Sequence, residues 1–268
     1  MRAAERCSGF SLIEIVVVLA LLGLIAGAAS SVALRATRGN VKQKTLARMQ
    51  ELLTAMIGEP ARGEFGYLGD MGELPDTSLT QLFVRGTQQP AAADPVDGIV
   101  SGYNGPYILN SGNATTGFTD FWNSAIRYTP GSAQLTSLGP DRTLGTADDI
   151  VYPSAAPVLA GTVTVVAKGL LAAGGPPVGL RSDEASVAVF HTRASDNTRA
   201  QIATSYTGAQ GSGIWLSGAV HLGAHGVSVT GLDASGSGGH DFSGSVSRTV
   251  VSVSRGPVVV EVLLEEAP

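Results

Sequence analysis

The feature that most limits how this chain can fold is an apolar run close to its N-terminus. Residues 10–34 read FSLIEIVVVLALLGLIAGAASSVAL. A helix of about 25 residues, rising about 1.5 Å per residue, is long enough to cross a hydrocarbon layer of roughly 30 Å. Arg2 and Arg6 precede the run, and Arg35 and Arg38 follow it. A core helix of a soluble protein rarely contains so long a stretch with so few polar residues, so we expect a helix that inserts into a membrane.

Glu14 is an acidic residue inside this run. One interpretation of the run is an ordinary secretory signal peptide, cut after the small residues Ala26-Gly27-Ala28. However, an ionisable residue near the centre of a membrane helix costs roughly 2.5–3.5 kcal/mol. A signal peptide that is removed has no use for such a residue. Glu14 therefore favours a helix that is retained, in which the carboxylate has a task.

The residues around the start of the run, Gly9-Phe10-Ser11-Leu12-Ile13-Glu14, resemble the processing site of type IV prepilins, which is found in pilins and in type II secretion pseudopilins. The resemblance implies that a prepilin peptidase cuts between Gly9 and Phe10 and that the new terminus at Phe10 is methylated. A glycine suits the extended chain in a protease site, because it presents no side chain. The resemblance also implies that Glu14 pairs with the terminal ammonium of a neighbouring subunit and sets the register of a filament.

A second helical pattern continues beyond the apolar run. Apolar residues recur there at spacings of three and four, which places them on one face of a helix. They are Leu46, Met49, Leu53, Met56 and Ile57. We therefore predict one helix over residues 10–57, ended by Glu59-Pro60. Its second half would pack on a globular head, although a plain amphipathic surface helix would give the same pattern.

The rest of the chain is predicted to be largely β structure. Its 35 glycines, 6% aromatic residues and 15% charged residues indicate turn-rich β structure rather than a helical bundle. In the head, residues 104–108 and 120–128 are predicted strands, and residues 78–83 a short helix. The predicted fold class is α+β, with a long N-terminal helix packed on a small antiparallel sheet and followed by a second, all-β, sandwich-like domain.

The head also resembles the major pseudopilin of type II secretion, which contains a D-P-W-G-N-P-Y-x-Y segment followed by S-L-G-x-D-G and an acidic loop. Asp120, Trp122 and Tyr128 match this pattern. The chain departs from it at Phe121, Ser124 and Ala125, and has Arg142 in place of the glycine after the first aspartate. Together with the leader and the helix, the resemblance covers residues 1–152.

The acidic loop, residues 137–150, lies where the pseudopilin family binds calcium. Ca²⁺ takes six to eight oxygen ligands from carboxylates, hydroxyls and carbonyls. The resemblance implies as ligands the Leu138 carbonyl, the Asp141 and Asp148 carboxylates and the Thr146 hydroxyl. The positive charge of Arg142 disfavours a cation unless its side chain points away. A solvated acidic turn is the alternative interpretation.

The second half of the chain follows a Pro/Ala-rich linker, residues 154–160. It contains five segments rich in β-branched residues, separated by turns of Gly, Ser and Asp. These segments are residues 162–166, 186–190, 226–229, 249–253 and 258–262. Several short strands of this kind predict a β-sandwich over residues 161–268. The predicted order is a leader (1–9), a helix (10–57), a head (58–153), a linker and the sandwich.

Several classes of function find little support in the sequence. The net charge of -5 and the pI near 5.3 provide no basic surface for nucleic acid. Cys7 is the only cysteine, so an intrachain disulfide and a cysteine metal site are excluded. The histidines form no H-E-x-x-H motif, and His221 and His225 are not expected to align on a strand. No G-x-S-x-G motif occurs. We therefore expect a protein that is not an enzyme.

The sequence thus predicts a structural subunit of a type II secretion pseudopilus-like filament. Its expected partners are copies of itself, a prepilin peptidase, an inner-membrane assembly platform and other pseudopilins. It would cross the inner membrane once, with its soluble part in the periplasm or outside the cell. The alternatives are a type IV pilin or minor pilin in adhesion or motility, and a cell-surface β domain on a plain signal anchor.

Overall fold

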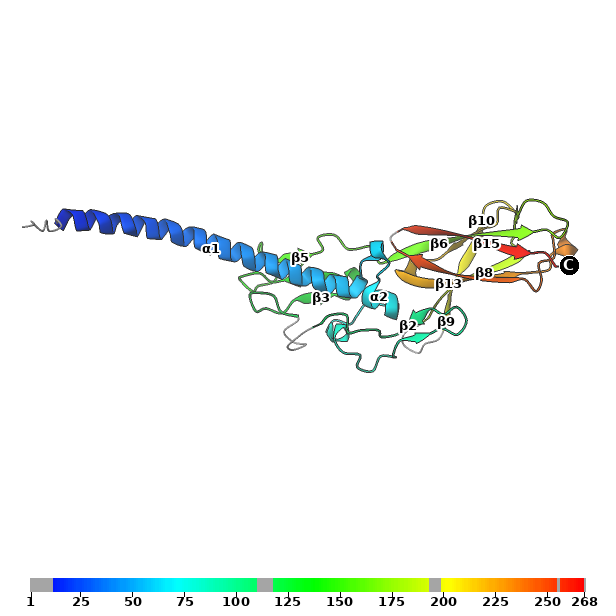
Figure 1. Cartoon of the computed structure of the whole chain (residues 1–268), viewed down its shortest axis with the longest axis horizontal. Coiled ribbons are helices and arrows are strands. Elements are labelled where there is room, and N and C mark those ends of the chain that lie inside the picture. The colour runs from blue at the N-terminus through cyan, green and yellow to red at the C-terminus, as the bar shows by residue number, and fades with distance from the viewer. Residues whose placement is uncertain (1–11, 110–117, 193–198, 255, 268) are drawn as a thin grey trace, which may run out of the picture.

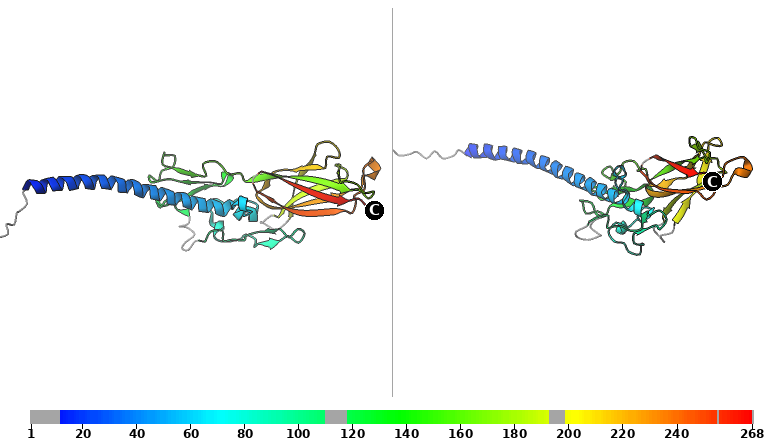
Figure 2. Two further views of the ribbon diagram at one scale, coloured as in Figure 1. Left: turned by 45° about the horizontal axis from the view of Figure 1, so that its top comes forward. Right: turned by 45° about the vertical axis from the view of Figure 1, so that its right-hand side comes forward.

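The computed structural model describes residues 12–109, 118–192, 199–254 and 256–267. A long helix, α1 (Leu12–Ile57), leads into two β-rich bodies that follow one another along the long axis of the molecule (Figure 1). We call residues 58–153 the head and residues 160–267 the sandwich. The first part of α1 projects away from both bodies, and the C-terminus lies at the opposite end of the molecule in every view (Figure 2).

Helix α1 has two halves with different surroundings. In the first half, apolar side chains from Leu12 to Ile25 are exposed, Leu12 by 80%. In the second half, Met49, Leu52 and Met56 are completely buried in the head. The helix is continuous over 46 residues, roughly 70 Å at 1.5 Å per residue. The head is thus built around the second half of the helix.

The end of α1 is fixed by the chain reversal that follows it. Gly58 has a φ of +68°, and its N–H donates to the carbonyl of Thr54 at 2.7 Å. A Cβ at this position would lie 2.1 Å from the Glu64 carbonyl oxygen, so only glycine fits. Pro60 comes two residues later and cannot continue the helix.

The head has short elements joined by long loops. The helical elements are η1 (Pro60–Arg62), α2 (Gly66–Met71), η2 (Thr80–Leu82) and η4 (Pro130–Ser132), and the strands are β1 (Ala92–Ala93), β2 (Val100–Ser101), β3 (Arg127–Thr129), β4 (Gln134–Ser137) and β5 (Ile150–Tyr152). Strands β3, β4 and β5 form an antiparallel meander, of which β4 and β5 contact α1. The small antiparallel sheet on the helix agrees with the α+β class predicted from the sequence.

Two head strands predicted from the sequence are wrong. Residues 104–108 form no strand, because the N–H groups of Tyr107 and Ile108 donate to the Leu82 carbonyl at 2.9 and 3.3 Å. In the segment 120–128, strand structure begins only at Arg127. The side chain of Asp120 accepts hydrogen bonds from the N–H groups of residues 122 and 124, which closes a turn instead. The short helix predicted at 78–83 is the single 3₁₀ turn η2.

The sandwich is made of two sheets of longer strands. Its elements are β6 (Ala160–Leu170), β7 (Val178–Gly179), β8 (Ala185–Thr192), β9 (Arg199–Ile202), β10 (Thr204–Thr207), β11 (Ile214–Ser217), β12 (Val220–His221), β13 (Gly223–Gly231), η5 (Ser235–Ser237), β14 (Val246–Val253) and β15 (Pro257–Glu265). One sheet has the order β14-β13-β8-β9. The other centres on β6, which pairs with β11, β12, β7 and β15, and β10 extends it beyond β11. All these pairs are antiparallel except β15 with β6.

The core of the sandwich lies between its two sheets. Strand β6 alternates as expected for a half-buried strand, and Val163, Val165 and Ala167 are fully buried. Phe242 is also fully buried. A Cβ at Gly169 would lie 2.2 Å from its ring, so the ring uses the space that a side chain would occupy. All five segments predicted as strands lie inside β6, β8, β13, β14 and β15.

The head and the sandwich are in direct contact. Leu222, between β12 and β13, is fully buried and belongs to the hydrophobic core of the head. Its N–H donates to the carbonyl of Leu159, which also packs on that core. At Gly223, with a φ of +141°, a Cβ would lie 3.1 Å from the Cα of Gly69 on α2. The two bodies therefore share a close-packed junction.

Candidate functional site

The N-terminal site predicted from the sequence is only partly described. Gly9 and Phe10 lie outside the described residues. Glu14 lies in the first turn of α1, where its side chain is exposed. It borders a shallow apolar hollow that is lined by Ile15, Val18 and Leu19. The carboxylate is thus surrounded by apolar surface of its own helix.

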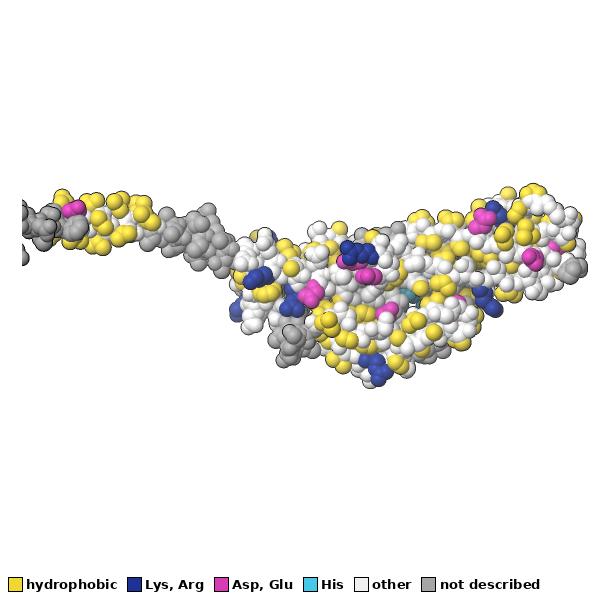
Figure 3. Space-filling model, viewed as in Figure 1, with side chains coloured by type: hydrophobic (Ala, Val, Ile, Leu, Met, Phe, Trp, Pro, Cys, Tyr) yellow, Lys and Arg dark blue, Asp and Glu magenta, His cyan; other side chains and the backbone are white. Residues whose placement is uncertain are grey.

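The first half of α1 is an exposed apolar surface. Exposed fractions of its large side chains include 73% for Leu24 and 62% for Leu19, and Figure 3 shows this part of the helix covered with hydrophobic atoms. Soluble monomers rarely expose a continuous apolar surface of this kind, which usually marks a protein or membrane contact. Within the part of the chain that the structure describes, no helix combines the length and hydropathy required to span a membrane.

The acidic loop joins β4 to β5 and is closed by the side chain of Asp148. Its Oδ1 accepts a hydrogen bond from the Thr146 hydroxyl at 2.7 Å, and its Oδ2 accepts one from the Asp141 N–H at 3.1 Å. These two hydrogen bonds lower the pKa of the Asp148 carboxyl, because both favour the ionised form. Gly139 has a φ of +63°, and a Cβ there would lie 2.5 Å from the Asp148 carbonyl oxygen. The loop is therefore tightly folded.

Arg142 points away from the middle of the loop. Its φ is +58°, a left-handed conformation, which explains why a glycine suits this position in the pseudopilin pattern. Its guanidinium donates to the carbonyl of Trp122 at 2.8 Å. The sequence left room for a cation in the loop only if the Arg142 side chain points away from it, and the structure shows that it does.

Asp149 was not among the ligands predicted from the sequence. Its Oδ2 accepts the Gly145 N–H at 2.6 Å, and its Oδ1 is buried without a hydrogen-bond partner. The loop thus offers hard oxygen donors of the kind that Ca²⁺ prefers, including one buried oxygen that is unsatisfied. Nevertheless, among the residues described here no three His, Cys, Asp or Glu side chains are spaced to hold a metal ion. The carboxylates bond mainly to groups of the loop itself.

Asp120 connects the acidic loop to the Asp-x-Trp segment. It is only 5% exposed. Its Oδ1 accepts hydrogen bonds from the N–H groups of Trp122 and Ser124, and its Oδ2 accepts one from the Ser137 hydroxyl at 2.6 Å. The next residue, Phe121, donates its N–H to the Thr45 hydroxyl on α1 at 3.2 Å. Asp120 and Trp122, two of the residues that match the pseudopilin pattern, therefore lie between the helix and the loop.

Three of the four histidines meet at the junction. The ring centroids of His221 and His225 are 4.6 Å apart, and that of His191 lies 5.3 Å from the first and 6.5 Å from the second. The expectation that His221 and His225 would not align is wrong: His221 ends β12 and His225 lies in β13, and the two rings meet across the link between these strands. The remaining histidine, His240, pairs instead with Glu266 at 3.0 Å.

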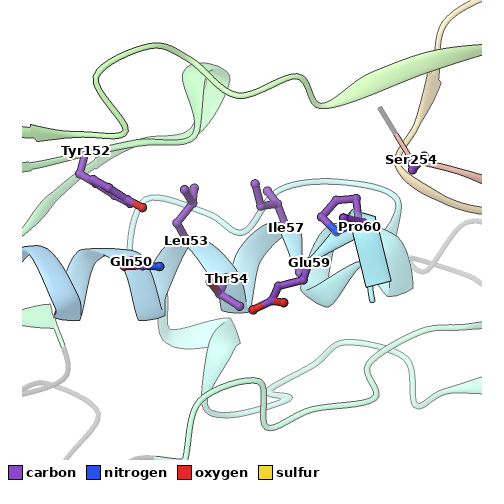
Figure 4. A pocket seen from close by; sticks show the side chains of 10 residues that line it. Gln50, Leu53, Thr54, Ile57, Glu59, Pro60, Tyr152 and Ser254 are labelled. Atoms are coloured by element: carbon purple, nitrogen blue, oxygen red, sulfur yellow. The ribbon is translucent and has the colours of Figure 1, made fainter. Parts of the chain in front are cut away.

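An open groove of about 490 Å³ lies where α1 ends (Figure 4). Its walls come from α1, from the end of β5 and from the turn after β14. The lining side chains include Leu53, Ile57, Pro60, Tyr152 and Ser254. Among the described residues that line the groove, Glu59 is the only one with a carboxylate, and it forms an ion pair with Arg62 at 3.0 Å.

Comparison with known proteins finds one family match. Residues 6–30 match the prokaryotic N-terminal methylation motif, a type IV pilin-like signal. No curated protein matches the chain. Among solved structures, a leucine-rich repeat protein from Bacteroides thetaiotaomicron is similar at 16% identity and a TM-score of 0.18, over 56% of this chain and 19% of that one. So low a score says nothing about the fold. The methylation motif implies processing by a prepilin peptidase, a membrane-anchored N-terminus and assembly into filaments in general.

Proposed function

We propose that this protein is a structural subunit of a type II secretion pseudopilus-like filament. The observation that carries the proposal is the methylation motif at residues 6–30, which includes the exposed apolar first half of α1. A helix of this kind needs a lipid or protein environment on all sides. The inner membrane would supply that environment before assembly, and neighbouring helices would supply it in the filament. The head and the sandwich would then lie in the periplasm.

Glu14 supplies the specificity of assembly in this proposal. Cleavage before Phe10 would create an ammonium group four residues from the carboxylate. A carboxylate in an apolar environment is stable only beside a cation, and the ammonium of a neighbouring subunit would provide it. Gly23 has no atom within 4 Å of the place where its Cβ would be, so another helix can approach closely there. Filament growth would push secreted proteins outward.

The head supports the pseudopilin version of the proposal. Asp120, Trp122 and the acidic loop are held together in the order that the major pseudopilin pattern requires. We also propose that this loop binds Ca²⁺, through the Leu138 carbonyl, Asp141, Thr146 and Asp148. The buried Oδ1 of Asp149 is a further oxygen that a cation would satisfy. The bound ion would hold the two ends of the loop together.

A type IV pilin or minor pilin in adhesion is the second candidate. The sandwich lies at the end of the molecule farthest from the free part of α1 (Figure 1). That position would place it on the outside of a filament, where a binding domain is useful. In either case we propose an assembly protein rather than an enzyme.

The test of the proposal begins with the mature protein. Intact-mass measurement should give a chain that starts at N-methylated Phe10. A chain that starts at Ala29 would identify an ordinary signal peptide and would contradict the filament proposal. Loss of secretion in a deletion strain would identify the pseudopilin function, whereas loss of surface adhesion alone would identify the pilin function.

Glu14→Ala tests the assembly step. The variant should be processed and membrane-bound, because it lacks the insertion cost of roughly 2.5–3.5 kcal/mol. Filament yield should fall at least about a hundredfold, since an ammonium left unpaired in an apolar interface costs about 3–5 kcal/mol. Sheared filaments from equal amounts of processed protein give the measurement. Glu51→Ala is the matched control, because Glu51 lies on the exposed side of the same helix, 3.7 Å from Arg48. Normal yield from Glu14→Ala would contradict the register hypothesis.

A further inference from the structure

One edge of the sandwich is formed by the outermost strands of its two sheets. Among the described strands, β14 pairs only with β13, and β15 pairs only with β6. Residues 254–256 join the two strands, which lie next to each other (Figure 2). We call this side of the sandwich the β14/β15 edge. An outermost strand has a row of backbone N–H and C=O groups that can pair with another chain.

The side chains of the β14/β15 edge are exposed and largely apolar. Its large apolar side chains have exposed fractions between 45% and 67%, for Val246 and Val250 on β14 and for Val259 and Leu263 on β15. Two exposed residues of opposite charge lie among them, Arg248 on β14 and Glu261 on β15. An exposed apolar edge of this length is a site at which another strand can add to a sheet.

The even-numbered residues of β14 present their backbone groups to the outside. The carbonyl of Ser245, just before β14, accepts the N–H of Gly231 at 2.8 Å, so residue 245 bonds inward, toward β13. Consecutive residues of a strand direct their backbone groups to opposite sides. The N–H and C=O groups of the even-numbered residues 246–252 therefore face outward.

On β15, the odd-numbered residues present their backbone groups to the outside. The N–H of Glu266, just after β15, donates to the Leu170 carbonyl at the end of β6. The N–H of Glu265 points the other way and donates to the Ser245 hydroxyl at 3.2 Å. The odd-numbered residues 259–263 therefore face outward as well. The same contact shows that Ser245 and Glu265 lie at one level along the strands.

A second copy of the sandwich matches this edge when it is rotated by 180° about an axis parallel to the strands. The rotation places β14 of each copy beside β15 of the other, which gives two identical contacts. Because the chain reverses direction between β14 and β15, both new pairs are antiparallel. The strands follow the long axis of the molecule, so the rotation leaves both α1 helices at the same end (Figure 1). Two chains anchored in one membrane have this relative orientation.

The charged residues select the register of the new pairs. Two registers bring outward residues of β14 and β15 face to face near the level fixed by the Ser245 contact. In one of them Arg248 lies opposite Glu261 of the second copy, and in the other it lies opposite the apolar Leu263. Opposite charges that face each other across two strands stabilise their pairing. Glu261 contacts Lys168 through Oε1 at 2.9 Å, which leaves its Oε2 for the guanidinium.

The register with the charge pair also matches the apolar side chains. It places Val246 opposite Leu263 and Val250 opposite Val259. The charge pair then has an apolar pair on each side, on the same face of the new sheet. The edge is thus complementary to itself in backbone hydrogen bonding, in charge and in apolar surface.

We propose that the β14/β15 edge is the interface at which two copies of this chain pair through their sandwiches. β14 of each copy adds to β15 of the other, so two continuous sheets run through both sandwiches. This interface goes beyond the proposed filament, because it joins the outer domains and leaves α1 free to assemble. Subunits that stand side by side in the membrane thus have a contact that does not involve α1.

Cysteine cross-linking of the full chain in detergent tests the interface. A ¹⁵N-labelled chain with Val250→Cys is mixed with an unlabelled chain with Val259→Cys, both in a Cys7→Ser background, and oxidised mildly. Directly opposite residues have Cα atoms about 5.5 Å apart, which suits a disulfide. We expect intact-mass measurement to show the mixed disulfide several-fold more often than disulfides between identical chains. In the matched control, Ser205→Cys on β10 replaces Val259→Cys and should give little mixed disulfide.

Arg248→Glu, present in both chains, tests the register. It places two carboxylates opposite each other in each of the two contacts, so the yield of mixed disulfide should fall at least about threefold. Arg127→Glu is the matched control, because Arg127 is exposed on β3 of the head. It should leave the yield unchanged.

Three results would overturn the proposal. One is a yield of mixed disulfide no higher than in the Ser205→Cys control. Another is a dominant disulfide between two Val250→Cys chains, which would place β14 against β14 and point the two α1 helices in opposite directions. The third is an unchanged yield of mixed disulfide in Arg248→Glu.

Discussion

The head and the sandwich have similar lengths but gain their stability in different ways. The head has strands of two to four residues, and its core includes the fully buried Met49, Leu52 and Met56 of α1. The sandwich has strands of up to eleven residues, and its core comes from its own two sheets. The head therefore depends on a helix that also serves another purpose, whereas the sandwich does not. A subunit of this design can carry an added domain without changing the part that assembles.

The largest expected effects come from truncating one fully buried side chain in each core. Phe242→Ala in the sandwich should cost about 3–5 kcal/mol and Leu52→Ala in the head about 2–5 kcal/mol, because both side chains are fully buried. The two tryptophans, Trp122 in the head and Trp215 in the sandwich, report each body separately when the other is replaced by Phe. Each variant should lower the melting temperature of its own body, by about 4–8 °C for each kcal/mol. If either variant lowers the melting temperatures reported by Trp122 and Trp215 equally, the head and the sandwich unfold as one cooperative unit, and the contrast between them is wrong.

A smaller effect is expected from replacing one buried carboxylate in each body. Asp120 accepts three hydrogen bonds, and Glu184 accepts two, from the N–H groups of Arg181 and His240 at 2.8 and 2.9 Å. Asp120→Asn and Glu184→Gln keep the shape but weaken bonds that contribute about 1.5–3 kcal/mol each when charged. We expect the larger loss of unfolding free energy for Asp120→Asn. Urea titrations followed by the fluorescence of Trp122 measure it.

The matched control for the carboxylates is Glu73→Gln in the head, because Glu73 is exposed. It should change the free energy of unfolding by less than about 0.5 kcal/mol. A loss for Asp120→Asn no larger than this would mean that the turn at residues 120–124 holds without its carboxylate.

The smallest expected effect is that of Ca²⁺ binding. It should stabilise the head and leave the stability of the sandwich unchanged. A tenfold excess of Ca²⁺ over its Kd adds about 1.4 kcal/mol to a folded state that alone binds the ion. The melting temperature reported by Trp122 should rise with Ca²⁺ and fall with chelator, while that reported by Trp215 should not change. Asp141→Ala and Asp148→Ala should abolish the response.

The control for calcium is Asp233→Ala, which removes an aspartate from a similar turn of the sandwich, where its Oδ1 accepts the Ser235 N–H. It should leave the response intact. A calcium response that survives in both loop variants would assign the loop to ordinary turn chemistry.

The same contrast explains which parts of the fold could be predicted from the sequence. β-Branched residues with a period of two predict the strands of the sandwich, and the spacing of apolar residues in 46–57 predicts a helix. The head gives no such signal. Its loops are set by single side chains that bond to the backbone, as Asp120 does to residues 122 and 124, and by contacts such as that of Tyr107 with Leu82. Short-range periodicity contains no information about either.

The candidate sites divide in a similar way. The residues around Glu14 and in the acidic loop are contiguous, so a sequence pattern identifies them. The histidine cluster depends on the pairing of β8 with β13, about forty residues apart, and on the contact of Gly72 with His221. Even the proximity of His221 and His225 depends on the link between β12 and β13, which the period of a single strand does not describe.

The pairing of the first and last strands of the sandwich has a mechanical consequence. Strand β15 runs parallel to β6 through nine register pairs, from Pro257 with Thr162 to Glu265 with Leu170. Tension between the membrane and the C-terminus pulls β6 from its start and β15 from its end, in opposite directions along the strands. All the hydrogen bonds of the pair then resist the force together in shear, instead of opening one after another. The sandwich is therefore strongest against a pull along the axis of its first and last strands.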